Sequence, residues 1–406
     1  MRYLFVVLTL ISTYGLARAQ ELGPYLEGGR IEAAETLLQR RVDADADNAG
    51  ARFGLGVVQF IGAFEQAAQS FNAYGFRVDE RGVAFLPFGI PAEPSGAPQS
   101  IRYEDVRTIL ETFLDDLGEA SETLAEVEDE KVSLELRVGL IRLDFDGDGI
   151  ATEEESLWRL FANLSGARGT QMPEDLRAFK IRFDAGDVHW FRGYAELLSA
   201  LTDIYLAHDS RELFERTAHL TYERVETPHD FLSEGADESL SGFDAAFIAD
   251  LIAFIHLMNF EVSEPERLRS ALRRLSTVTQ ESRLTWQAVL AETDNELEWL
   301  PNPDQQSVIG VQLTQAQIEG WLGFLDELDQ IVAGDLLVPY WRVQDGRGVN
   351  MRRVFLEPRT LDLLLWIQGS AATPYLEEGE LSSPETWGQL QRLFDGNFLN
   401  FAVWIN

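Results

Sequence analysis

Residues 131–155 read KVSLELRVGLIRLDFDGDGIATEEE, and their two halves show different patterns. From Val132 to Leu140, apolar side chains alternate with polar or small ones, which is the period of a β-strand. The stretch FKIRF at 179–183 alternates in the same way. We therefore expect two short strands that pair and enclose the acidic segment between them.

The second half, DFDGDGIATEEE at 144–155, carries aspartates at loop positions 1, 3 and 5, glycine at 6 and glutamate at 12. This pattern resembles the EF-hand calcium loop, in which oxygen ligands at those positions surround a hard cation. The resemblance implies side-chain oxygens from the aspartates, a backbone carbonyl at position 7, a water-bridged position 9 and a bidentate carboxylate at 12. The implied ligands of Ca²⁺ are Asp144, Asp146, Asp148, Ile150, Thr152 and Glu155.

The loop departs from the EF-hand pattern in two ways. Position 8, where a bulky apolar residue is usual, is Ala151, and a strand instead of a helix precedes the loop. A helix is expected after it, over about 153–164, and we find no second loop of this quality. These features favour a single structural site over a paired calcium sensor. The alternative is an acidic turn without metal, in which three aspartates within five residues would repel one another.

The N-terminus and the composition indicate an exported protein. Residues 1–19, MRYLFVVLTLISTYGLARA, have the layout of a secretory signal, with cleavage expected after Ala19 and a periplasmic or secreted product. Its apolar stretch is too short to span a bilayer. The chain has 68 acidic and 33 basic residues, a net charge of −35, which opposes binding to nucleic acid or anionic membranes. It has no cysteine, so no disulfide stabilises the fold.

Residues 20–75 contain two similar segments spaced 33 residues apart. Leu22-Gly23 matches Leu55-Gly56, and Gly29 matches Gly62. The pattern resembles a tetratricopeptide helical hairpin, which implies a helical pair that could offer a surface to a protein partner. Two units are fewer than the three or so that a solenoid needs. We therefore expect one hairpin docked on the rest, followed by a Pro/Gly-rich connector at 76–100 with a short strand at 83–86.

The remaining sequence predicts a mainly α fold, a multi-helix globular array. The segment 101–184 combines one helix with the strand–loop–helix–strand unit, and 185–406 is helical and rich in tryptophan. Asp187 is expected to cap a helix that runs to about 209, the apolar stretch 243–260 to form a buried helix, and 335–355 to form a short hairpin. Other helices are expected over 103–127, 265–291, 315–333 (with a Thr314–Gln317 capping box and a stop at Gly334) and from Pro384 onward.

No familiar catalytic motif is present, and whether the chain is an enzyme is left open. His208, Glu212, Glu215 and His219 could share a helix face and bind a transition metal, but Asp209-Ser210 reads as a helix start, and ion pairing with Arg211 and Arg216 is the simpler interpretation. A second polar cluster contains Asp184, Asp187 and His189.

The sequence therefore favours an exported, non-catalytic calcium-binding scaffold or interaction protein. The first alternative is a periplasmic carbohydrate- or peptide-binding protein that uses the tryptophan-rich region, and the second is a hydrolase of unrecognised type. The first alternative requires a pocket near Trp299, Trp341, Arg342 or Glu357.

Overall fold

The computed structural model describes residues 22–76, 96–164, 178–233, 245–393 and 401–402, and most of them are helical. The mainly α fold expected from the sequence is confirmed. The long helices are α2 (Ile31–Ala44), α3 (Ala49–Ala73), α4 (Tyr103–Ala125), α7 (Ala185–Leu206), α10 (Pro265–Ala291) and α11 (Gln315–Ala333). The short ones are α5 (Leu157–Leu164), α8 (Arg211–Thr217), α9 (Ala245–His256), α12 (Met351–Leu356), α13 (Leu363–Gln368), α14 (Pro384–Leu393) and the 3-10 turns η1 (Val138–Leu140), η2 (Ala218–Leu220), η3 (Asp230–Ser233) and η4 (Ser370–Tyr375).

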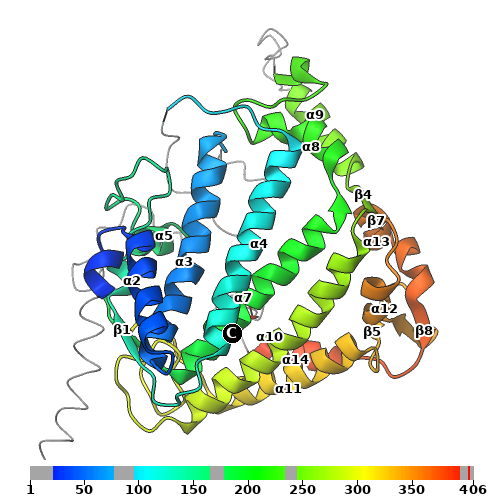
Figure 1. Cartoon of the computed structure of the whole chain (residues 1–406). Helices are drawn as coiled ribbons and strands as arrows, with labels where there is room; N and C mark the ends of the chain where they lie inside the picture. The colour runs from blue at the N-terminus through cyan, green and yellow to red at the C-terminus, as the bar shows by residue number, and fades with distance from the viewer. Residues whose placement is uncertain (1–21, 77–95, 165–177, 234–244, 394–400, 403–406) are drawn as a thin grey trace, which may run out of the picture.

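The long helices pack one on the next and form a fan (Figure 1). α2 packs on α3, α3 on α4, α4 on α7 and α7 on α10, while α11 lies against α10 at the lower end of the view. α4 and α10 therefore both pack against α7, and their axes spread apart from each other. The N-terminal pair α2–α3 is the expected helical hairpin. Residues 129–134 lie beside it, and a cavity of about 180 Å³ separates them from the two helices.

Two of the four apolar clusters in the described part of the chain join the long helices at their centre. The larger one includes the facing side chains of α3, α4 and α7. In it, the rings of Phe60 and Phe191 meet edge to face with centroids 5.5 Å apart. The second joins α10 to α11 through the buried rings of Trp286 and Trp321, with Phe401 beside them. These two tryptophans fill a core instead of lining a cleft. Burial of large aromatic side chains contributes much of the stability of such a fold.

The strands in the described residues are few and short, and the paired ones run antiparallel. The predicted pairing around the acidic loop is confirmed, with Leu134 opposite Phe183 and Leu136 opposite Ile181. The strands are β1 (Leu134–Leu136) with β2 (Ile181–Phe183); β3 (His208–Asp209), β4 (Asn259–Val262) and β7 (Leu361–Asp362) in the second sheet; and β5 (Val338–Pro339), β6 (Arg347–Val349) and β8 (Leu376–Glu378) in the third.

The first strand is shorter than its sequence pattern predicts. The alternation runs from Val132 to Leu140, but after Leu136 the chain turns into η1. β2 pairs along only three residues, so a longer β1 would leave its backbone groups without partners in this sheet. The alternation of apolar and polar residues therefore extends further along the chain than the residues that pair as a strand.

Helix ends defined by capping residues are predicted well. α10 and α11 have the expected bounds, Thr314 and Gln317 form the expected capping box, and Gly334 ends α11 in the left-handed conformation. The helix expected from 103 ends at Ala125, and the one after the loop starts at Leu157, four residues later than expected. α14 starts at Pro384 as predicted.

Three other expectations are wrong in detail. The N-cap of α7 is Asp184 instead of Asp187. Asp187 is the N3 residue, and its side chain accepts from the backbone of Asp184 to complete the capping box. Of the expected hairpin in 335–355, β5 and β6 pair, but 351–356 is a helix capped by Asn350. The apolar helix α9 is not buried: Ile252 is 62% exposed, because α9 lies at the edge of the molecule, beside α8.

Some expectations fall outside the described residues. The signal segment 1–19 and the short strand at 83–86 are among them, as is most of the connector at 76–100. Within the described part of the chain, no helix is both long and apolar enough to cross a membrane.

Candidate metal centre

The acidic loop 144–155 is closed at its base by backbone hydrogen bonds. Leu143 N donates to Glu155 O at 3.2 Å, and Leu157 N donates to Ile141 O at 2.9 Å. An isolated antiparallel bridge between Arg142 and Ser156 lies between these bonds. The chain therefore leaves η1, forms a complete loop and returns beside its starting point before α5 begins.

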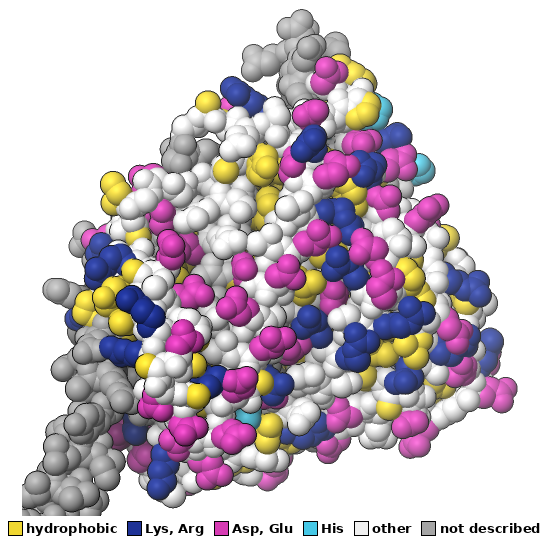
Figure 2. All heavy atoms as spheres, viewed as in Figure 1, with side chains coloured by type: hydrophobic (Ala, Val, Ile, Leu, Met, Phe, Trp, Pro, Cys, Tyr) yellow, Lys and Arg dark blue, Asp and Glu magenta, His cyan; other side chains and the backbone are white. Residues whose placement is uncertain are grey.

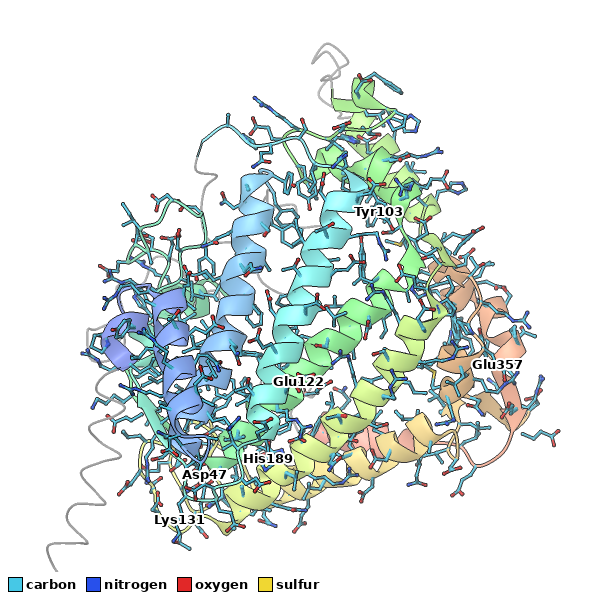
Figure 3. The ribbon with its side chains drawn as sticks, in the orientation of Figure 1. Asp47, Tyr103, Glu122, Lys131, His189 and Glu357 are labelled. Carbon is cyan, nitrogen blue, oxygen red and sulfur yellow. The ribbon has the colours of Figure 1, made fainter. Side chains whose placement is uncertain are left out.

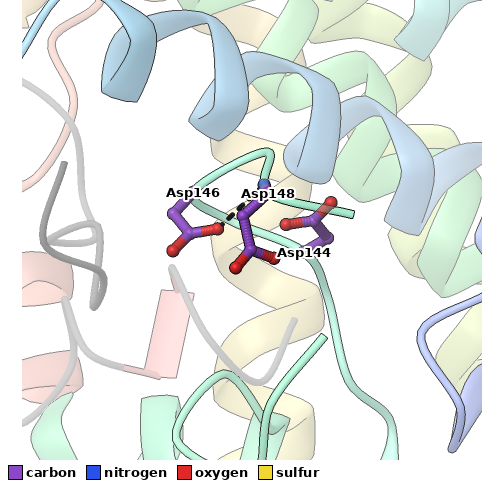
Figure 4. A group of neighbouring side chains, drawn as sticks. All are labelled: Asp144, Asp146 and Asp148. Atoms are coloured by element: carbon purple, nitrogen blue, oxygen red, sulfur yellow. Dashed lines mark hydrogen bonds between the residues drawn. The ribbon is translucent and has the colours of Figure 1, made fainter. Parts of the chain in front are cut away.

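The three aspartates face one another inside this loop (Figure 4). One carboxylate oxygen from each of Asp144, Asp146 and Asp148 lies within 4.8 Å of the others. The loop backbone fixes them: Asp146 Oδ1 accepts from Asp148 N at 3.0 Å, and Asp144 Oδ2 accepts from Gly149 N at 2.9 Å. Gly147 and Gly149 have φ of 71° and 85°, a conformation that favours glycine. The tight turn therefore depends on the glycines of the motif.

One oxygen in this cluster has no hydrogen-bond donor. Asp144 Oδ1 is buried, and none of the described residues donates to it. A buried carboxylate oxygen without a partner is unfavourable, and a bound cation would compensate it. Partial burial raises the pKa of Asp146, and the charges of Glu155, Asp148 and Asp144 raise it further. Both observations fit an all-oxygen site for a hard cation such as Ca²⁺.

Glu155 faces the loop backbone in this structure. Its side chain is buried, and it accepts hydrogen bonds from Phe145 N at 2.8 Å, Thr152 N at 2.8 Å and Thr152 Oγ1 at 2.9 Å. Thr152 thus holds Glu155, and Ile150 exposes its side chain to solvent. Of the six residues predicted as ligands, the structure brings the three aspartates together. The Glu155 carboxylate instead accepts hydrogen bonds from backbone amides of the loop.

Helix α3 supports the loop from outside, which the sequence did not reveal. Glu65 Oε1 accepts from Asp144 N, and Gln69 Nε2 donates to Asp144 O, both at 2.7 Å. Burial raises the pKa of Glu65 to about 7, and the charges of Asp144 and Glu155 contribute. Glu65 and Gln69 are one helical turn apart, which is the only sequence signal that they act together.

The contact between Ala151 and Gly29 explains the unusual residue at position 8. Gly29 has φ of 62°, and a Cβ built on it would overlap the Cβ of Ala151. Arg142 N also donates to Leu26 O at 3.0 Å in the same region. The N-terminal segment therefore occupies the space where a bulky residue at position 8 would extend.

A second acidic group lies where α7 begins and α10 ends. Oxygens of Asp184, Glu292 and Glu298 lie within 4.8 Å of one another, and Trp299 Nε1 donates to the buried Asp187 beside them at 2.6 Å. Burial is the main cause that raises the pKa of Glu292 to about 8 and of Glu298 to about 7, with the charge of Asp184 next. The spacing would admit a cation, and without a cation the high pKa values favour carboxyl groups that share protons. The sequence analysis predicted a polar cluster here with Asp184 and Asp187, but not the two glutamates.

The stability of this corner should depend on pH. Glu292 and Glu298 have raised pKa values in the folded state, so the folded chain binds more protons than the unfolded chain, where a glutamate has a pKa of 4.5. Their contribution to stability is complete below pH 4.5 and is lost as the pH rises toward 8. We expect the melting temperature to fall between pH 5 and pH 8, and Glu292→Gln to reduce that fall. Glu130→Gln is the exposed control, and equal slopes for the two variants would contradict this account.

The remaining candidate clusters do not assemble. His208 Nδ1 contacts Ile204 O at 2.7 Å, and His219 Nε2 contacts Asp250 at 3.2 Å, so the two histidines have separate partners. Glu212 pairs with Arg216, as the simpler interpretation expected. His189 contacts Glu281 on α10 instead of joining Asp184 and Asp187.

The residues named for a tryptophan pocket also lie apart. Trp299 packs against Trp190 beside the first core, whereas Trp341 is exposed with the Arg342 guanidinium 4.3 Å from its ring centre. Glu357 pairs with Arg353 at 2.6 Å.

Comparison with protein families, curated proteins and solved structures finds no match for this chain. Its function is therefore argued from its own residues.

Proposed function

We propose that this chain is an exported calcium-binding protein whose single ion has a structural role, in a scaffold or interaction protein without catalysis of its own. The observation that carries the proposal is the buried Asp144 Oδ1, to which none of the described residues donates, in a cluster of three converging aspartates. Asp144, Asp146 and Asp148 would hold the ion. Export rests on the signal-like segment at 1–19.

The position of the site supports a structural role. The loop contacts α3 through Glu65 and Gln69 and the N-terminal turn through Gly29. In the sequence it lies between the paired strands β1 and β2. An ion that fixes the loop therefore also fixes the surfaces on which the N-terminal hairpin docks. Binding energy at such a site adds to the stability of the fold.

Calcium titration of the full chain tests the proposal. We expect calorimetry to show one site, with magnesium much weaker, because magnesium needs a smaller octahedral site and keeps its waters. Asp148→Asn, at an exposed position of the cluster, should weaken calcium at least tenfold, whereas Asp47→Asn, far from the loop, should not. The proposal fails if wild type and Asp148→Asn give the same calorimetric trace.

Chelation should also lower the melting temperature. An ion bound by the folded state alone stabilises it by about 2.7 kcal/mol at a hundredfold excess over Kd. Scanning calorimetry with calcium and with a chelator should show this difference in wild type and lose it in Asp144→Asn. Identical melting of wild type in both conditions would mean that the ion, if bound, stabilises nothing.

A further inference from the structure

A groove of about 660 Å³ lies where α4 and α10 diverge above α7. Residues 114–122 of α4 form one wall, and residues 264–274, from the N-cap of α10 into the helix, form the other. Gly118 stands on the α4 wall, and a Cβ built on it would meet nothing within 4 Å. This volume is in the range of about 300–1,000 Å³ that small ligands occupy in proteins.

The floor of the groove is already neutralised. Asp203 on α7 is only 3% exposed, and it accepts from Arg274 Nε at 3.2 Å and Arg267 Nη1 at 3.5 Å. Arg274 also pairs with Glu196 at 2.8 Å. These ion pairs join α7 to α10 and leave no charge on the floor to attract a ligand.

The α4 wall carries carboxylates without partners. Asp115 and Glu122 line the groove, and neither forms a hydrogen bond or ion pair with any residue that the structure describes. Glu119 between them accepts from Gln59 Nε2 at 2.8 Å. In Figure 3, Glu122 projects from α4 beside α7 and α10. This wall presents negative charge that the protein does not balance.

The α10 wall carries charges of both signs. Glu264 pairs with Arg267, and the exposed Glu266 also lines the groove. Arg273 lines the groove, is exposed, and has no acidic partner among the described side chains, unlike Arg267 and Arg274. Figure 2 shows acidic and basic side chains next to one another on this face of the molecule. In a chain of net charge −35, an unpaired arginine beside a groove is a specific place for an anionic group.

We propose that this groove binds a short basic peptide with a free terminal carboxylate. Its ammonium or guanidinium groups pair with Asp115 and Glu122, and its carboxylate pairs with Arg273. A polyanion such as a nucleotide is disfavoured by the α4 wall, and a simple polyamine leaves Arg273 unused. The inference is independent of the calcium site.

The test uses calorimetry of the full chain with three tetrapeptides at about 0.15 M salt, which screens the long-range attraction of any cation to this acidic protein. The probes are Lys-Ala-Lys-Ala with a free carboxylate, the same peptide as its C-terminal amide, and Glu-Ala-Glu-Ala. We expect the first to bind most tightly and the third not to bind.

Variants assign the binding to the groove. Glu122→Gln and Asp115→Asn should each weaken Lys-Ala-Lys-Ala about fivefold, as expected for the loss of one partly exposed ion pair. Arg273→Gln should weaken the free-carboxylate peptide by a similar factor and leave the amide unchanged. Gly118→Trp should block binding by filling the groove. Glu128→Gln, an exposed acid just beyond α4, is the matched control and should change nothing.

Several results would overturn the proposal. These are no binding of Lys-Ala-Lys-Ala at millimolar concentration, equal binding of the glutamate peptide, and equal effects of Glu122→Gln and Glu128→Gln. If the amide binds as tightly as the free carboxylate, Arg273 has no ligand role and the proposed peptide class is wrong. Because Glu122 is exposed and without partners in the described fold, Glu122→Gln tests the groove even if Gly118→Trp does not fold.

Discussion

Replacing Gly29 by alanine is expected to lower the free energy of unfolding by about 2–5 kcal/mol. Two costs add. Gly29 has φ of 62°, where any side chain is strained, and the new Cβ would overlap the Cβ of Ala151. The N-terminal turn would have to move off the acidic loop, so calcium binding should weaken as well. Denaturant unfolding and calcium titration of the variant measure the two effects.

Two controls separate the causes. Gly310→Ala carries the backbone strain alone, because Gly310 has φ of 80° and open space around it. The double variant Gly29→Ala/Ala151→Gly removes the overlapping methyl group, since the Cα of residue 151 lies 3.4 Å from the new Cβ. The double variant should therefore recover the packing cost of about 1–3 kcal/mol and keep the strain. A Gly29→Ala protein no less stable than Gly310→Ala would show that the turn and the loop do not depend on each other.

This contact illustrates what the sequence could and could not predict about the site. The cluster of Asp144, Asp146 and Asp148 is local, so its spacing alone predicts the convergence that the structure shows. Glu65 and Gln69 act on the same loop from a distance of more than 70 residues in the chain. A single sequence contains no signal for such a contact, and the alanine at position 8 appears only as a departure from a pattern.

The same distinction holds for the fold. The start of α10 and both ends of α11 lie where the sequence predicts them, because proline, a capping box and a terminal glycine act on their own neighbours in the chain. The burial of α9 was predicted from its apolar composition and is wrong, because burial depends on what other elements cover. The glutamates that join Asp184 were missed for the same reason, since Glu292 and Glu298 reach it only through the packing of α10 on α7.

The packing of α7 on α10 leads to the second large effect, which is expected at Arg192. Glu281 on α10 is only 1% exposed, and its carboxylate accepts from Arg192 Nη1 at 2.5 Å and contacts His189 Nδ1 at 2.7 Å. Arg192→Ala leaves that carboxylate buried with His189 alone. Removing one partner of a buried ion pair costs about 3–5 kcal/mol, and denaturant unfolding should show a loss of this size.

A second substitution determines whether the cost comes from charge or from packing. In Arg192→Ala/Glu281→Gln the buried side chain is neutral, so most of the lost stability should return if the uncompensated charge is the cause. Arg283→Ala is the matched control on α10, because its partners Asp326 and Asp329 are largely exposed and such pairs contribute about 0–1 kcal/mol. If Arg192→Ala costs no more than Arg283→Ala, the Glu281 pair does not hold α7 to α10. The groove floor would then depend on the ion pairs of Asp203 with Arg267 and Arg274 and on the pair of Arg274 with Glu196.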